Sequence, residues 1–172
     1  IVKNTMNIED IPTFRSWKMN ERHYGKLQGL NKLTAESIYT KDKITQWRRS
    51  YNSIPPLLSF KDYYNPKFES KYNNINHDQL PLGESLKMTR ERILPYWNNK
   101  VSKYLCDNNT ILISGHGNSL RSLIMEIDNI SEQDITKLHI PNCVPIIYKF
   151  DYHKNIITDN QHSTLLSAKY LL

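Results

Sequence analysis

The feature that most restricts the fold of this chain is a short apolar run that leads into a glycine turn and then a helical pattern. Residues 111–113 read Ile-Leu-Ile, a run suited to a strand buried on both faces. Residues 115–117 read Gly-His-Gly, and apolar residues recur at helical spacing over 120–127. A capping box at 131–134 and a strand pattern at 144–150 continue the alternation. The chain is therefore predicted to adopt an α/β fold with a mostly parallel sheet.

Helical patterns precede this unit. The spacing predicts one helix over residues 34–51, with Thr34 as its N-cap, and another over 84–105, with a kink or local break at Pro95. Between them, residues 59–79 are aromatic, rich in asparagine and without a helical or strand period. We expect this segment to be a long surface excursion of the kind that often covers a site.

The length fits a single domain spanning residues 1–172, because 172 residues can bury one core but are short for two. With 38% hydrophobic and 23% charged residues, the composition is that of a soluble globular protein. The formal charge of +6 favours an anionic partner, which could be nucleic acid, an acidic membrane surface or a small phosphorylated or carboxylated ligand. Charge alone does not choose among them.

The cysteines and the hydropathy of the chain bear on whether it holds a metal, spans a membrane or is secreted. Cys106 and Cys143 are the only cysteines and have no zinc-ligand spacing, which argues against a metal site built on them and suits a reducing compartment. No apolar run approaches the roughly 20 residues that a membrane span needs, and no signal peptide opens the sequence. We therefore expect a cytoplasmic protein with no membrane partner.

The turn at residues 115–117 is predicted to place His116 at the carboxyl end of the sheet, beside a helix N-terminus. Free N–H groups and the helix dipole favour a phosphate at such a position. An imidazole there could bond to, or stabilise, a phosphoryl group during transfer. From the spacing alone, His116 fits equally well as a histidine that merely caps the turn.

A polar, glycine-punctuated segment covers residues 20–32. In it, Glu21 could act as a general acid or base, and Arg22, Tyr24 and Lys32 could bind oxyanions through directed hydrogen bonds. An ordinary solvated loop is the alternative.

Arg48 and Arg49 are adjacent in a helical pattern and could clamp one multiply charged ligand between two guanidinium groups. Adjacent arginines are more often a solvated helix face. Together with Arg22 and Lys32, however, they would gather positive charge toward an acidic ligand.

Several separated blocks share their order with a known family. They are Glu21-Arg22-His23-Tyr24-Gly25, Leu27-Gln28-Gly29-Leu30-Asn31-Lys32, Gln46-Trp47-Arg48-Arg49, Leu80-Pro81-Leu82, Glu84-Ser85-Leu86, Pro95-Tyr96-Trp97, His116-Gly117-Asn118-Ser119-Leu120-Arg121, Ile140-Pro141 and Val144-Pro145 with Tyr148. In this order and over nearly the whole chain, the blocks resemble the 2,3-bisphosphoglycerate-dependent phosphoglycerate mutases.

The resemblance implies a three-layer α/β/α sandwich of the histidine-phosphatase type and an enzyme that interconverts 3-phosphoglycerate and 2-phosphoglycerate through a phosphohistidine, primed by 2,3-bisphosphoglycerate and without a metal. It implies that Glu21 exchanges the proton of the substrate hydroxyl and that His116 stabilises charge beside the phosphohistidine. The residues implied to bind the substrate are Arg22, His23, Tyr24, Lys32, Arg48, Arg49, Gly117 and Asn118.

The resemblance also implies a homodimer or homotetramer that acts on a small phosphorylated carboxylic acid and does not bind nucleic acid. Two alternatives stay open: a histidine-type phosphatase on small phosphorylated metabolites, and a non-catalytic phosphate-binding homologue.

The main departure from the family is at the front of the chain. No segment matches the family's Leu-x-Arg-His-Gly-x-Ser, and residues 1–17 look like the region just before the Glu21 block. We therefore expect a domain that is incomplete at its N-terminus, with the nucleophilic histidine outside this chain. Smaller departures are Gly83, where the family usually has threonine, and the pair Asn142-Cys143.

Overall fold

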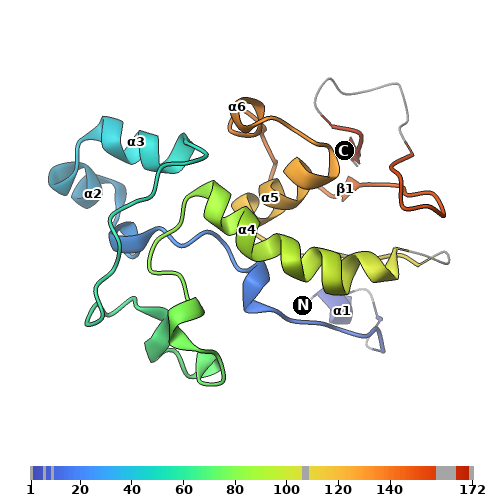
Figure 1. The fold of residues 1–172 in the computed structure, drawn as a ribbon, viewed down its shortest axis with the longest axis horizontal. Helices are drawn as coiled ribbons and strands as arrows, with labels where there is room; N and C mark the ends of the chain where they lie inside the picture. Colours follow the sequence, from blue (N-terminus) through green and yellow to red (C-terminus); the bar gives the residue numbers. More distant parts are fainter. Residues whose placement is uncertain (1, 6, 9, 106–108, 158–165, 171–172) are drawn as a thin grey trace.

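The computed structural model describes residues 2–5, 7–8, 10–105, 109–157 and 166–170 (Figure 1). Its helices are α1 (Val2–Thr5), α2 (Lys32–Ile38), α3 (Lys41–Arg49), α4 (Leu86–Tyr96), α5 (Gly117–Ile127) and α6 (Glu132–Ile135). Its strands are β1 (Ile146–Ile147) and β2 (Lys169–Tyr170). A π-helical turn covers Trp97–Val101, and 3₁₀ turns cover Trp17–Met19, Gly25–Leu27, Pro66–Phe68, Ser70–Tyr72, His77–Gln79 and Ser102–Tyr104.

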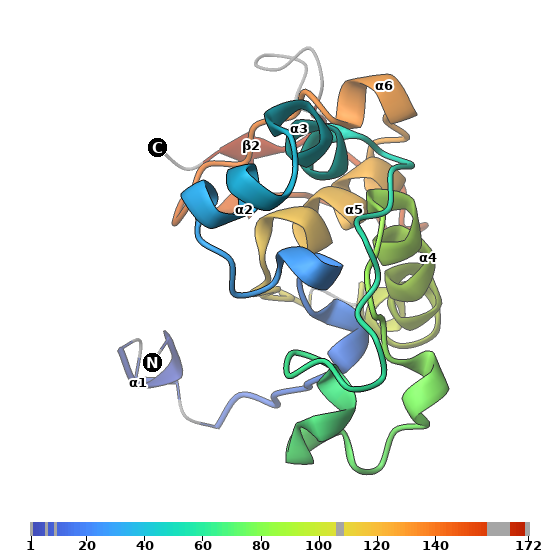
Figure 2. The ribbon, with the colours of Figure 1, turned by 90° about the vertical axis from the view of Figure 1, so that its left-hand side faces the viewer.

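The single helix predicted over residues 34–51 is two helices, α2 and α3, which contact each other at one end of the molecule (Figures 1 and 2). Asn31, and not Thr34, caps α2: its side chain accepts a hydrogen bond from the backbone N–H of Thr34 at 2.9 Å. Tyr39 is extended, and the hydroxyl of Thr40 caps α3. The prediction was wrong because Thr40 offers a second helix start inside the periodic pattern.

Helices α4 and α5 pack against each other and form the centre of the molecule (Figure 1). Ser85 caps α4 by accepting a hydrogen bond from the N–H of Met88 at 3.2 Å. The helix runs through Pro95 and then changes to the π-helical turn. A proline has no N–H to donate and crowds the preceding turn, which accounts for a change of helix type at this point.

The predicted strand at residues 111–113 has no partner among the described residues, and Leu112 is 70% exposed, so its predicted burial on both faces is wrong here. A strand exists only where a neighbouring chain segment completes the hydrogen-bonded ladder. The strand predicted at 144–150 is confirmed only at β1, which pairs antiparallel with β2. No parallel pairing occurs in the described part of the chain.

The largest core lies beneath α5 and the segment that follows it. Its buried residues are Tyr51, Leu86, Ile124, Met125, Ile130, Ile135, Leu138, Leu166 and Ala168. The capping box is confirmed at α6, where Ser131 accepts a hydrogen bond from the N–H of Asp134 at 3.1 Å. These contacts hold α5, and therefore its N-terminus, against the loops that precede α4.

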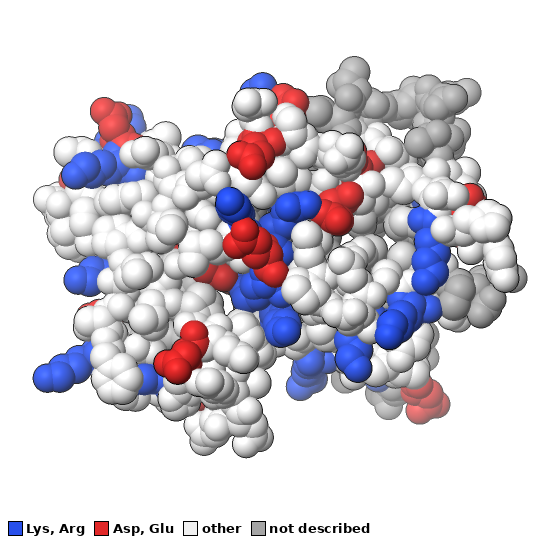
Figure 3. Space-filling view, viewed as in Figure 1, with Lys and Arg blue, Asp and Glu red and all other residues white. Residues whose placement is uncertain are grey.

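On the face shown in Figure 3, the charged residues do not form one basic patch. On the side shown in Figure 3, lysine and arginine side chains are spread over the surface and mixed with acidic ones near the centre. Cys143 is exposed, and Cys106 lies outside the described residues. In the described part of the chain, no helix is long and apolar enough to cross a membrane.

Candidate active site

The carboxylate of Glu21 lies at the N-terminus of α5. It accepts hydrogen bonds from the backbone N–H of Asn118 at 3.0 Å and of Ser119 at 3.4 Å, and from the Asn118 side-chain amide. The first N–H groups of a helix have no partner within the helix, and the helix dipole adds positive charge there. Glu21 therefore fills the anion position that a helix N-terminus provides.

Asn118 joins Glu21 to two further side chains. Its amide Nδ2 also donates to the hydroxyl of Tyr24 at 2.9 Å, and its Oδ1 accepts from Nη1 of Arg121 at 2.7 Å. Nη2 of Arg121 donates to the carbonyl oxygen of Leu138 at 3.0 Å. Burial lowers the pKa of the Arg121 guanidinium, an effect that the nearby Tyr24 and Glu21 oppose.

The arginine pair at the end of α3 adds positive charge beside this network. The guanidinium carbon of Arg48 lies 5.7 Å from the centre of the Tyr24 ring, and Arg22 lies 5.1 Å from the same ring. Arg49 is close enough to Arg121 for their charges to repel. Arg48 and Arg49 are exposed, so both can reach a ligand.

Arg22 has a different environment from the one predicted for a ligand-binding side chain. Only 2% of it is exposed, and its guanidinium donates to the backbone carbonyl oxygens of Glu84 at 2.7 Å, Ser53 at 3.0 Å and Trp47. Burial lowers its pKa, against the opposing effect of Tyr24 and two carboxylates. In this arrangement Arg22 ties three chain segments together beneath the site.

His23 is half-buried, and its Nδ1 accepts a hydrogen bond from the N–H of Gly25 at 3.0 Å. Burial lowers the pKa of His23, and the nearby Glu84 acts in the opposite direction. Gly25 itself has φ +55°, and a Cβ there would collide with the carbonyl oxygen of Pro56. The chain therefore turns sharply at Gly25, next to Tyr24, whose hydroxyl bonds to Asn118.

A buried ion pair supports the segment that carries Glu21. Nε and Nη2 of Arg92 donate to the two carboxylate oxygens of Glu84 at 2.7 and 2.8 Å, and the two side chains are only 8% and 3% exposed. Nη1 of Arg92 donates to the carbonyl oxygen of Lys18 at 2.7 Å, and Nη2 to that of Glu21 at 3.4 Å. The Glu84 carboxylate also accepts from the N–H of His23 at 2.9 Å. The pair therefore holds the backbone on both sides of Glu21.

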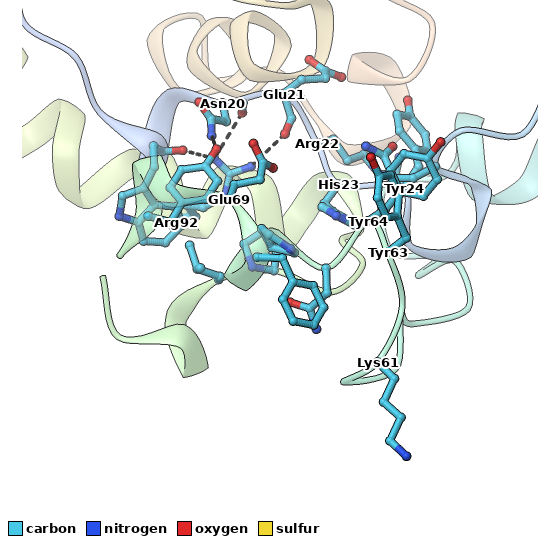
Figure 4. A pocket seen from close by; sticks show the side chains of 18 residues that line it. Asn20, Glu21, Arg22, His23, Tyr24, Lys61, Tyr63, Tyr64, Glu69 and Arg92 are labelled. Carbon is cyan, nitrogen blue, oxygen red and sulfur yellow. Dashed lines mark hydrogen bonds between the residues drawn. The ribbon is translucent and has the colours of Figure 1, made fainter. Parts of the chain in front are cut away.

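A cavity of about 810 Å³ lies beside the same segment, and the excursion at 59–79 supplies much of its wall. In Figure 4, His23 points toward this cavity, whereas the carboxylate of Glu21 points away from it. Tyr63 and Tyr64 form an aromatic wall. The segment at 59–79 was predicted to be an excursion of the kind that covers a site, and it lines this cavity beside Glu21. The network around Asn118 lies on the other side of the Glu21 segment.

The remaining predicted residues are placed as follows. His116 is the N-cap residue of α5 and makes no side-chain capping bond; it is exposed and borders a second cavity of about 1130 Å³. Gly117 is the first residue of α5, next to Asn118. Lys32 is exposed at the first position of α2, and no described contact brings it to Glu21. The structure thus joins Glu21, Tyr24 and Asn118 directly, with Arg48 and Arg49 beside them.

Three side chains of the site, Arg121, Glu84 and Arg92, had no role predicted from the sequence. Asn118 and Arg121 are three positions apart on a helix, a spacing at which side chains meet, so this contact had a visible signal. The Glu84–Arg92 pair is eight positions apart and spans the start of α4. Nothing in that spacing indicated that it would hold the Glu21 segment.

Comparison with known proteins shows which family the chain is related to. The profile of the histidine phosphatase superfamily (branch 1) matches residues 59–161. The chain belongs to the histidine phosphatase superfamily. It is 43% identical over 158 residues to a 2,3-bisphosphoglycerate-dependent phosphoglycerate mutase 2 of Bacteroides thetaiotaomicron, covering 92% of this chain and 64% of the relative. It is 49% identical over 141 residues to a 2,3-bisphosphoglycerate-dependent phosphoglycerate mutase of Buchnera aphidicola, covering 82% of this chain and 61% of the relative.

The chain thus spans less than two thirds of the length of the curated relatives that it matches. Membership of the superfamily implies an α/β fold, as predicted from the alternating pattern. In the described residues of this superfamily member, no group of three or more His, Cys, Asp or Glu side chains is placed to hold a metal ion.

Proposed function

We propose that the protein containing this chain interconverts 3-phosphoglycerate and 2-phosphoglycerate through a phosphohistidine. The observation that carries the proposal is the carboxylate of Glu21, fixed at the N-terminus of α5 by Asn118 and Ser119. The names of the relatives support it. A carboxylate in this position can take a proton from a substrate hydroxyl and return it.

The charges around Glu21 suit a ligand with phosphate and carboxylate groups. Arg48 and Arg49 are exposed at the end of α3, beside Tyr24 and Asn118. Phosphoryl transfer depends mainly on positioning and on countering charge on the phosphoryl oxygens, which guanidinium groups do well. These side chains also fit 2,3-bisphosphoglycerate, which supplies the phosphoryl group that primes the histidine.

The proposed roles combine these positions with the resemblance to the mutases. Glu21 exchanges the proton of the substrate hydroxyl, and His116, at the N-cap of α5, stabilises charge on the phosphoryl group. Tyr24 and Asn118 orient the substrate next to Glu21. The substrate-binding set is completed by Arg22, His23, Lys32, Arg48, Arg49 and Gly117. Arg22 contributes by fixing the segment, because its guanidinium already bonds to three backbone carbonyl oxygens, whereas His23 faces the neighbouring cavity.

The same proposal includes a cytoplasmic homodimer or homotetramer with one phosphoglycerate mutase-like domain, built as a three-layer sandwich with a mostly parallel sheet. It includes no metal, no nucleic-acid partner and no membrane partner.

The test is formation of 2-phosphoglycerate from 3-phosphoglycerate by the intact purified protein, with and without 2,3-bisphosphoglycerate, while released phosphate is followed in parallel. Turnover stimulated by 2,3-bisphosphoglycerate supports the mutase. Phosphate release without isomerisation indicates a phosphatase, and binding without either reaction indicates a non-catalytic homologue.

The phosphorylated residue can be located in the same material. Brief incubation with labelled 2,3-bisphosphoglycerate, followed by peptide mapping, is expected to put an acid-labile phosphate on a histidine other than the six in this chain. A label on His116 would overturn its assigned role.

A further inference from the structure

The side-chain amide of Asn118 has a different partner on each side. Its Nδ2 faces the carboxylate of Glu21 and the hydroxyl of Tyr24, and its Oδ1 faces the guanidinium of Arg121. An asparagine amide can rotate by half a turn, which exchanges its acceptor oxygen and donor nitrogen. The rotated amide would put an acceptor oxygen against the Glu21 carboxylate, which only accepts when it is ionised.

Arg121 removes this alternative. A guanidinium carries donors and no acceptor, so it can bond only to the oxygen of the amide. Rotation would face the donor nitrogen of Asn118 with the donor nitrogen of Arg121. The cation therefore selects the one orientation in which Asn118 donates toward Glu21 and Tyr24.

Arg121 is itself held in place from two directions. It extends from α5, where Asn118 lies one turn earlier, and its Nη2 donates to the carbonyl oxygen of Leu138 at 3.0 Å, beyond α6. Its Nε is buried and has no partner among the described residues. A buried donor without a partner is destabilising. Arg121 therefore keeps its bonds to Asn118 and Leu138 even though its own Nε is left without a partner among the described residues.

We infer that Arg121 is a positioning residue for Glu21, acting through Asn118: its guanidinium fixes the Asn118 amide so that the side-chain nitrogen of Asn118 donates to the Glu21 carboxylate beside the main-chain N–H. The inference rests on the proposed function, since Glu21 exchanges the substrate proton only in that reaction.

The kinetic test is a double-mutant cycle in the intact protein with Arg121→Met, Asn118→Ala and the double variant, assayed for conversion of 3-phosphoglycerate. Arg121→Met is expected to lower kcat by about 10- to 100-fold, the loss that follows when a reacting group is held less accurately, while KM changes by less than about 3-fold. In the Asn118→Ala background the same change should alter kcat by less than about 2-fold, because two residues that act through one contact are not additive. Equal effects in both backgrounds would overturn the inference.

Arg90→Met is the matched control. Arg90 is also partly buried, also has a buried Nε without a partner among the described residues, and pairs with Glu126 away from Asn118. Its variant should keep the wild-type kcat. A loss of kcat equal to that of Arg121→Met would mean that loss of any buried arginine suffices, which contradicts a specific role. Arg121→Lys, which keeps a donor but not the two-sided fork, should recover only part of the rate.

A readout independent of catalysis separates this inference from the proposed function. The side-chain amide of Asn118 can be assigned by NMR from its loss in Asn118→Ala, and its hydrogen exchange should accelerate at least about 10-fold in Arg121→Met as the fixed bonds to Glu21 and Tyr24 are lost. An unchanged exchange rate would overturn the inference. If the wild-type protein has no mutase activity but the amide responds as expected, the proposed function fails and the control of Asn118 by Arg121 stands.

Discussion

The buried pair of Glu84 and Arg92 allows a stability prediction with a definite magnitude. Arg92→Met removes two hydrogen bonds of 2.7 and 2.8 Å to a carboxylate that is 3% exposed, and leaves that charge with the N–H of His23 as its described donor. Removing one partner of a buried ion pair costs about 3–5 kcal/mol, because the other charge remains buried. Since domains of this size are stable by only about 5–15 kcal/mol, we expect a large part of the stability to be lost.

The assay is equilibrium unfolding in urea followed by circular dichroism, which avoids the fluorescence of Trp17, whose ring lies 6.0 Å from the Arg92 guanidinium. Glu84→Gln removes the buried negative charge, so Arg92→Met in that background should cost about 2 kcal/mol less than in the wild type. Lys71→Met, which breaks the exposed pair with Glu69, is the control and should cost less than about 1 kcal/mol. The reasoning is refuted if Arg92→Met costs under about 1 kcal/mol or if the two substitutions are additive.

Three further predictions follow from the site. Burial lowers the pKa of His23 below its ordinary value of 6.5. As the pH falls, the unfolded chain therefore takes up the proton of His23 first, and the free energy of unfolding falls as the pH drops below about 6.5. His23→Asn should lose less stability than the wild type between pH 7.5 and 5.5, as measured by urea unfolding. Gly25→Ala forces a Cβ against Pro56 at φ +55° and should cost about 1–3 kcal/mol, whereas Gly117→Ala, whose Cβ would meet no atom within 4 Å, should cost less than about 1 kcal/mol. Glu21→Gln and His116→Ala should each lower mutase turnover by at least about 100-fold with circular dichroism unchanged, and near-normal rates in either variant would contradict its role.

The parts of the site that the sequence predicted are those determined over a few neighbouring residues. Gly115 and Gly117 around His116 indicated a turn into a helix, and α5 begins at Gly117. Glu21 was singled out as a titratable group in an irregular polar segment, and the structure brings it to that helix end. The meeting of the two depends on contacts 97 positions apart, which local patterns do not contain. The resemblance to the mutases was needed to join them.

The sheet was harder to predict for the opposite reason. Apolar, β-branched runs at residues 111–113 and 144–150 show that a segment is suited to a strand, but a strand also needs partners. Among the described residues, the run at 144–150 pairs only at β1, which is antiparallel to β2, and at Phe150, which forms an isolated antiparallel bridge with Ile156; the run at 111–113 has no partner. Leu112 is consequently 70% exposed although its sequence context is that of a buried strand.

Arg22 and Arg121 show that residue type alone does not determine the role of an arginine in this site. Both arginines lie within one network around Tyr24, and burial lowers the pKa of both. Arg22 donates to three backbone carbonyl oxygens, so its loss would loosen the segments that it joins. Arg121 donates to the one side-chain oxygen whose orientation decides what Glu21 receives. Substitution of Arg22 should therefore reduce stability first, and substitution of Arg121 should reduce turnover first. Only Arg121 acts on a group that bonds to Glu21, the carboxylate proposed to exchange the substrate proton.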